Sequence, residues 1–193
     1  MLHAQLRDAD VTLLVRDARL GDHRAWDELV ARYGGMVWAV ARAHRLCDAD
    51  AADVSQATWL KAVEHLEGIK DPRALGGWLA TTARRESLRL LRKSARLDPL
   101  DGAPETADCG PELGERLLTG ERDATLWAAF EALGPRDQAL LRMLAADPAP
   151  SYEEIGAALA MPIGSIGPTR ARALERLRRA IEHLGVPAYE ALR

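Results

Sequence analysis

The sequence predicts an all-helical fold, and three observations support that class. The apolar residues are mainly Ala and Leu, with a single Phe, and such a composition favours helices over strands. Apolar side chains recur at steps of three and four residues, which is the period of amphipathic helices. With 48% hydrophobic and 28% charged residues, the chain has the composition of a globular protein with a core.

The first helical segment carries apolar residues at helical spacing, among them Trp26, Leu29 and Val37. This spacing predicts one long amphipathic helix. We expect the pair Gly34-Gly35 to interrupt or kink it, because glycine is costly in a helix interior.

Two further helices are expected in the N-terminal half. One begins at Asp48 or Asp50, with acidic residues in its first turn, and ends near Gly68. The next follows Asp71-Pro72, since Asp can cap a helix and Pro suits its first position, and it has a strongly basic far end. The first of these two helices runs through Val54, Ala57, Trp59, Leu60, Val63 and Leu66.

Residues 98–122 concentrate Pro, Gly and acid, with seven acidic residues against two basic ones and little periodicity. Such a segment is typical of a flexible linker and solvates a tether, although its acid could also compete for cationic surfaces. The sequence therefore predicts two small helical domains, 1–97 and 123–186, joined by the linker and followed by a C-terminal tail, 187–193.

The C-terminal half is expected to hold four short helices. Gly134-Pro135 separates two of them, which would run antiparallel. Ser151 and Glu154 have the spacing of a capping box and would open the third. Ser165 is expected to cap the fourth, over residues 166–184, with Pro168 falling in its first turn.

The last two of these helices have the pattern of a helix-turn-helix. Small Gly156 lets the helices cross closely, Gly164 lies in the turn, and Ile166 and Leu174 would face inward. The second helix would present Thr169, Arg170, Arg172, Arg176, Arg178 and Arg179. Arginine suits both base and phosphate contacts, but a solvated basic face on an ordinary helical hairpin would have the same pattern. Because the formal net charge is −3, any nucleic-acid contact must come from such local patches.

Nothing in the sequence indicates an enzyme, a metal site or a cofactor. Cys47 and Cys109 lie far apart without ligand spacing, the five histidines are scattered, and no Gly-rich phosphate loop follows a strand. No apolar run approaches the length of a membrane span, and the N-terminus does not have the pattern of a signal peptide. We therefore expect a cytoplasmic protein that does not insert into a membrane.

Several stretches together resemble bacterial RNA polymerase sigma factors. Residues 133–144, 151–156 and 165–174 look like sigma region 4, while 53–60 and 77–84 resemble parts of region 2. Since the linker joins the two without an intervening domain, the architecture is similar to the extracytoplasmic-function (ECF) class.

The resemblance implies a three- to four-helix bundle for region 2 and a four-helix domain with the helix-turn-helix for region 4. It implies binding to core RNA polymerase, through the β′ coiled coil and the β flap, and to promoter DNA. The chain would direct the polymerase to specific promoters and initiate transcription. An anti-sigma factor is a further implied partner.

The resemblance also implies three sets of contact residues. The core polymerase would be bound by Asp53, Gln56 and Lys61. The minus-10 element would be held by Arg84, Arg85, Arg89, Arg92 and Lys93. The minus-35 element would be read by Ser165, Thr169, Arg170, Arg172, Arg176 and Arg178, with Thr169, Arg170 and Arg172 nearest the base edges.

Some of these assignments have bland alternatives. Asp53 and Gln56 could merely solvate their helix, as could Arg176 and Arg178. Trp78 could stack on an unpaired base or pack in the core. Two other functions would also fit part of the pattern: an ordinary helix-turn-helix regulator that senses a ligand or dimerises, and a helical protein that titrates a partner without touching DNA.

Overall fold

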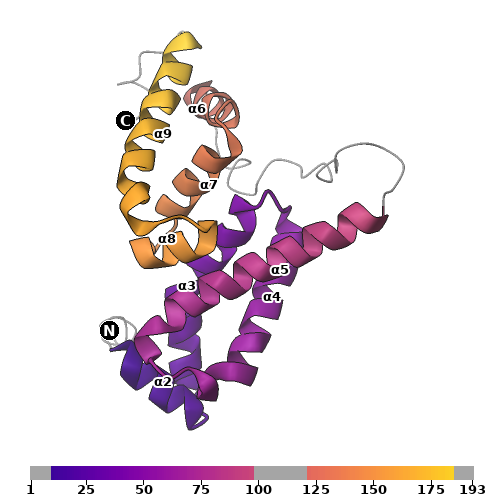
Figure 1. Ribbon diagram of the computed structural model, residues 1–193, viewed down its shortest axis with the longest axis vertical. Coiled ribbons are helices and arrows are strands. Elements are labelled where there is room, and N and C mark those ends of the chain that lie inside the picture. The colour runs from indigo at the N-terminus through magenta and orange to yellow at the C-terminus, as the bar shows by residue number, and fades with distance from the viewer. Residues whose placement is uncertain (1–9, 98–120, 185–193) are drawn as a thin grey trace.

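The computed structural model describes residues 10–97 and 121–184, and within that part of the chain all regular secondary structure is helical (Figure 1). The all-α class predicted from composition and periodicity is confirmed. The predicted tail and Cys109 lie outside the described residues, and so does the predicted linker except for its last two residues. The boundaries of the two predicted domains are therefore not tested.

The N-terminal half begins with two helices, α2 (Val11–Arg19) and α3 (His23–Ala43). The chain turns between them at Gly21, whose φ of +84° favours glycine, and Asp22 caps α3 through the backbone N–H of Arg24. The predicted break at Gly34-Gly35 is wrong, because α3 runs through both glycines. Packing of the helix on its neighbours offsets the cost of two interior glycines.

The next helices follow the prediction closely. They are α4 (Asp48–His65), the short 3-10 helices η1 (Leu66–Gly68) and η2 (Pro72–Ala74), and the long α5 (Leu75–Leu97). The Asp71 carboxylate accepts from the backbone N–H of Arg73 at 3.0 Å, which confirms its capping role. α3, α4 and α5 pack on one another, and α2 closes one end of α3. The largest buried side chains of this bundle are Val15, Leu29, Met36, Val37, Val40, Leu75 and Leu79.

The C-terminal half contains α6 (Glu121–Glu131), α7 (Pro135–Leu144), α8 (Tyr152–Leu159) and α9 (Ile163–His183). The capping box at the start of α8 is confirmed. The Ser151 hydroxyl accepts from the backbone N–H of Glu154 at 3.2 Å, and the Glu154 carboxylate accepts from the backbone N–H of Ser151 at 2.7 Å.

The start of α9 differs from the prediction. The helix begins three residues before Ile166, with Pro162 as its N-cap, so that the Ser165 hydroxyl donates to the Pro162 carbonyl at 2.7 Å instead of capping. Pro168 consequently lies inside the helix, where it lacks the N–H that would bond the preceding turn. Leu174, expected to face inward, is 44% exposed.

The turn between α8 and α9 has the close crossing expected of a helix-turn-helix. Ala160 ends α8 in the left-handed conformation, with φ of +51°, and the backbone N–H of Met161 donates to the Gly156 carbonyl at 3.0 Å. A Cβ on Gly156 would lie 2.9 Å from the Met161 carbonyl oxygen, so glycine is needed there. The prediction that Gly156 permits a close approach is confirmed.

The two halves pack directly against each other. α8 lies on α5 and α7 lies on α3, as Figure 1 shows. The buried apolar cluster continues across this contact, from Met36 and Val37 of α3 to Leu140, Met143 and Ile155 of the C-terminal half. Helices α2 to α5 therefore share one hydrophobic core with α7, α8 and the start of α9.

Candidate polymerase and nucleic-acid interfaces

The outer face of α4 is partly apolar. Its inner face is formed by Ala51, Val54, Thr58 and Ala62, which are buried. The apolar Leu60 and Val63 do not face inward, since these side chains are 61% and 60% exposed. Helical spacing places them on one face with the exposed Asp53 and Gln56. We name these four residues the α4 surface; two large apolar side chains beside two polar ones give it the composition of a docking site.

Lys61 points to a different neighbour. Its ammonium contacts the Glu86 carboxylate of α5, which also accepts from the Arg89 guanidinium at 2.7 Å. The Glu86 side chain is only 5% exposed. Burial alone would raise the pKa of this carboxyl, but the hydrogen bonds from Lys61 and Arg89 outweigh it, and the net pKa lies below the ordinary value. Lys61 therefore joins α4 to α5, and Glu86 is a central residue that the sequence analysis missed.

The cations proposed for the minus-10 element gather on the C-terminal part of α5, which projects from the bundle in Figure 1. Arg85, Arg89, Arg92 and Lys93 are exposed. Arg84 is half-buried and lies close enough to His44 for its charge to act on that ring. Burial first, and the charge of Arg84 second, lower the pKa of His44.

Trp78 packs rather than projecting freely. It is half-buried against the core cluster, and its ring centroid lies 6.2 Å from that of His65. Of the two alternatives given by the sequence, this position favours packing.

Helix α9 has two kinds of arginine. Arg170 and Arg172 are exposed near its N-terminal end, and the Arg172 guanidinium donates to the Pro168 carbonyl at 3.3 Å. Farther along, Arg176 pairs with the buried Asp137 of α7, while Arg178 pairs with Glu175 at 3.0 Å. Further ion pairs in this part join Arg178 to Glu182 and Arg179 to Glu175.

Two smaller predicted residues of α9 are less accessible than expected. Thr169 is only 9% exposed and lines a cleft together with Asp137, Arg172 and Arg176. Ser165 is half-buried and bonded to Pro162. The sequence gives no sign of this, because α7 supplies the walls of the cleft.

The described residues contain neither a metal-binding cluster nor a membrane-spanning helix. No group of three or more His, Cys or acidic side chains in the described ranges could hold a metal ion. No helix in them is long and apolar enough to cross a membrane. Cys47 caps α4, since its sulfur accepts from the backbone N–H of Asp50 at 3.5 Å.

Comparisons with known proteins agree on one family. The sigma-70 region 2 family matches residues 29–97, which include α4 and α5. The chain is 29% identical to the ECF RNA polymerase sigma factor SigE of Mycolicibacterium smegmatis over 82% of the chain and 63% of that relative, and so spans less than two thirds of its length. It is 26% identical to the ECF RNA polymerase sigma-E factor of Escherichia coli K12 over 89% of the chain and 94% of that protein.

Two solved structures share the fold. CnrH, in complex with the cytosolic domain of CnrY, superposes with a TM-score of 0.59 at 22% identity, covering 90% of this chain and 99% of CnrH. The sigma factor RpoE of Bartonella quintana, in complex with the anti-sigma factor NepR, gives a TM-score of 0.55 at 21% identity, covering 81% and 96%.

Residues 29–97 match sigma-70 region 2, and with its paired helical halves and its helix-turn-helix the chain is similar to bacterial sigma factors, which are transcription initiation factors. The relatives that the chain resembles are of the ECF class.

Proposed function

We propose that the chain acts as an ECF sigma factor, which binds core RNA polymerase in the cytoplasm, directs it to specific promoters and initiates transcription there, with no catalytic activity of its own. The observation that carries the proposal is the α4 surface. It lies within the region 2 match, and its Leu60 and Val63 are apolar but exposed. A face of this kind is stable in the free protein and gains free energy when a partner covers it.

Core polymerase would bind at two places. The β′ coiled coil would cover the α4 surface, with Leu60 and Val63 giving about 1–2 kcal/mol each on burial and Asp53 and Gln56 making polar contacts. Lys61 would support this face through Glu86. The β flap would occupy the apolar groove between α6 and α9, which is lined by Ala128, Ala129, Ala132, Arg179, Ala180, His183 and Leu184.

The minus-10 element would lie along the projecting part of α5. Exposed arginines and a lysine stabilise separated strands by neutralising phosphates, and melting needs no covalent chemistry. Arg85, Arg92 and Lys93 are best placed for this role, since Arg89 already shares the charge of Glu86. Half-buried Arg84 would act where the projecting part of α5 leaves the bundle.

The minus-35 element would be read as duplex by the N-terminal part of α9. Arg170 and Arg172 are exposed and suit bidentate contacts to bases. Ser165 and Arg176 lie beside them and would contact the DNA backbone, Arg178 lies farther along the helix, and Thr169 would orient the helix from beneath.

An anti-sigma factor is a proposed further partner. RpoE was solved with the anti-sigma factor NepR, and CnrH with the cytosolic domain of CnrY. By analogy, a regulator of this chain would cover the surfaces that polymerase needs.

The test is binding and transcription with purified core polymerase. Leu60→Asp should weaken core binding at least about tenfold, because it replaces a gain of apolar burial by a desolvated charge. Leu20→Asp is the matched control, since Leu20 is 81% exposed at the end of α2 and is not one of the residues of the α4 surface. Equal affinities of the two variants would contradict the proposed docking face.

The same assay separates the alternatives. A chain that binds duplex DNA but not polymerase would be an ordinary helix-turn-helix regulator. A chain whose activity is unchanged by Arg170→Ala with Arg172→Ala would be an interaction protein that acts without DNA.

A further inference from the structure

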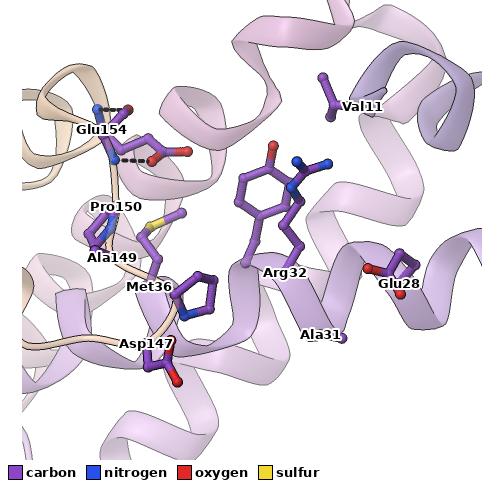
Figure 2. Close-up of a pocket in the computed structure, with 12 residues that line it drawn as sticks. Val11, Glu28, Ala31, Arg32, Met36, Asp147, Ala149, Pro150 and Glu154 are labelled. Atoms are coloured by element: carbon purple, nitrogen blue, oxygen red, sulfur yellow. Dashed lines mark hydrogen bonds between the residues drawn. The ribbon is translucent and has the colours of Figure 1, made fainter. Parts of the chain in front are cut away.

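A cavity of about 540 Å³ lies between α3 and the segment that joins α7 to α8 (Figure 2). Its volume is in the range of sites that bind small ligands. The first residue of α2 and the start of α8 complete its walls. None of the surfaces proposed for polymerase or DNA shares a residue with this lining, so the cavity needs an explanation of its own.

The first indication of a ligand is the carboxylate of Glu28. This residue of α3 is 6% exposed and lines the cavity. In the described part of the chain, no hydrogen bond or ion pair reaches its carboxylate. Burying a carboxylate without a partner costs free energy, and a cation in the cavity would offset that cost. Glu28 therefore points to a positively charged ligand.

Two further carboxylates belong to the opposite end of the cavity. The backbone of Asp147 meets α3 at Gly35, where a Cβ would lie 2.6 Å from the Asp147 carbonyl oxygen. Glu154 is held by the capping box of α8, and a Cβ on Gly76 would lie 1.8 Å from its Oε1 atom. In Figure 2, Glu28 lies at one end and both other acids lie toward the other. The seven residues from Glu28 to Gly35 extend about 10 Å along a helix, so the acids form two separated groups.

The electrostatic balance of the cavity is negative. Arg32 also lines it, so that three acidic side chains and one arginine leave a formal charge of −2. Burial first, and the charge of Glu154 second, raise the pKa of the Tyr33 phenol, while the charge of Arg32 acts in the opposite direction with a smaller effect. The carboxylate therefore outweighs the arginine at the Tyr33 ring, which is part of the lining.

The wall between the two acidic ends is largely apolar. Met36 lies beside Ala149 and Pro150 in Figure 2, and Ala31 continues this wall along α3. Such a surface suits methylene groups better than water or a hydrated ion. A metal ion does not fit, because the described residues offer no group of three or more side chains that could hold one. The shape of the lining therefore calls for a long organic cation with a positive charge near each end.

We propose that this cavity binds a linear aliphatic polyamine. One terminal ammonium group pairs with Glu28, the other lies between Asp147 and Glu154, and the methylene chain packs on Met36 and Pro150. Binding needs neither polymerase nor DNA. The inference therefore does not depend on the proposed function, and either can fail without the other.

The test is isothermal titration of the full-length protein with spermidine at neutral pH and physiological salt. Glu28→Gln should weaken the affinity at least about tenfold, since one ammonium group loses its charged partner. Asp27→Asn is the matched control, because Asp27 is the neighbouring residue of α3, is exposed and does not line the cavity. It removes the same charge, and its affinity should stay within about twofold of the unchanged protein.

Two results of this titration would overturn the inference. Equal losses in the two variants would mean that spermidine is attracted only by the overall charge of the protein. Absence of binding to the unchanged protein at up to about 10 mM spermidine would mean that the cavity takes no such ligand.

A second ligand tests recognition at both ends. Octylamine has about the length of spermidine but a single ammonium group, so it can satisfy only one of the two acidic ends. We expect spermidine to bind at least about tenfold more tightly than octylamine, because a charge-assisted hydrogen bond is lost with the second ammonium group. Equal affinities would contradict the proposed binding mode.

Stability in the absence of ligand separates a binding role of Glu28 from a structural one. Without polyamine, Glu28→Gln should unfold at the same urea concentration as the unchanged protein or at a higher one, since it removes an unpartnered buried carboxylate. Saturating spermidine should then raise the midpoint of the unchanged protein and of Asp27→Asn more than that of Glu28→Gln. A variant that is markedly less stable without ligand would show that Glu28 serves the fold, and would overturn the inference.

Discussion

The two basic helices, α5 and α9, carry similar numbers of arginines but partner them differently. On α5, Arg89 pairs with the buried Glu86, which it shares with Lys61 of α4. On α9, the C-terminal arginines pair with Asp137, Glu175 and Glu182. The charge on α5 is thus directed outward along its projecting end, whereas the charge on α9 is concentrated at its N-terminal part. A count of arginines does not show how many are available to DNA.

The largest expected effect tests the N-terminal part of α9. Arg170→Ala with Arg172→Ala should weaken holoenzyme binding to a promoter about 10²- to 10³-fold, since each bidentate base contact is worth about 1–3 kcal/mol. The measurement is an equilibrium titration with and without an intact minus-35 element. Arg178→Ala with Arg179→Ala is the control, because these side chains already pair with Glu175, and its loss should stay within a few-fold. Equal losses for the two pairs would remove the distinction drawn within α9.

A smaller effect is expected on α5. Arg85→Ala with Arg92→Ala should slow promoter melting about tenfold and reduce its salt dependence, since each neutralised phosphate of a single strand contributes about 0.7 to the logarithmic slope. Reactivity of unpaired thymines with permanganate measures melting. Binding to a duplex that contains only the minus-35 element should be unaffected; a parallel loss there would show that the two basic helices do not have separate roles.

The buried carboxylate of α5 should make stability depend on pH. Since the pKa of Glu86 is lowered in the folded state, its contribution is present above the unfolded pKa and is lost as the pH falls through the folded value. Glu86→Gln should cost about 1–2 kcal/mol at neutral pH, because two charge-assisted hydrogen bonds are weakened. Urea unfolding at pH 7 and below pH 4 should show this difference shrinking in acid. A constant difference at both values would mean that the ion pairs of Glu86 do not stabilise the fold.

The positions of most helices could be predicted from local sequence, because the start of a helix depends on the residues next to it. Asp71 and the Ser151–Glu154 box cap helices as expected. The sequence places the start of α9 three residues too late, because Pro162 and not Ser165 is the N-cap of the helix. Such errors move an element by one turn and leave the fold class intact.

Properties that depend on distant residues could not be predicted in this way. Leu60 and Val63 have the spacing of core residues, and only the position of α4 in the bundle shows that they face outward. A glycine within a helix pattern predicts a break or a weak helix, yet Gly35 and Gly76 permit the close contact between the halves. Thr169 is buried by α7, some thirty residues away in the sequence.

The smallest effect is expected from removing an acidic partner of the arginines in the C-terminal part of α9. Glu175 accepts from Arg178 and Arg179, and these hydrogen bonds lower its pKa, so it is ionised at neutral pH. Glu175→Gln would remove the charge that holds both arginines while leaving their positions on the helix. Because exposed ion pairs at this spacing stabilise a helix only weakly, the midpoint of urea unfolding should hardly change. Affinity for nonspecific duplex at low salt should rise slightly, with the gain disappearing at high salt, since Arg179 becomes available for phosphate contacts while Arg178 keeps its pair with Glu182. If affinity does not change, the C-terminal part of α9 lies beyond the reach of DNA, and its ion pairs serve only the helix.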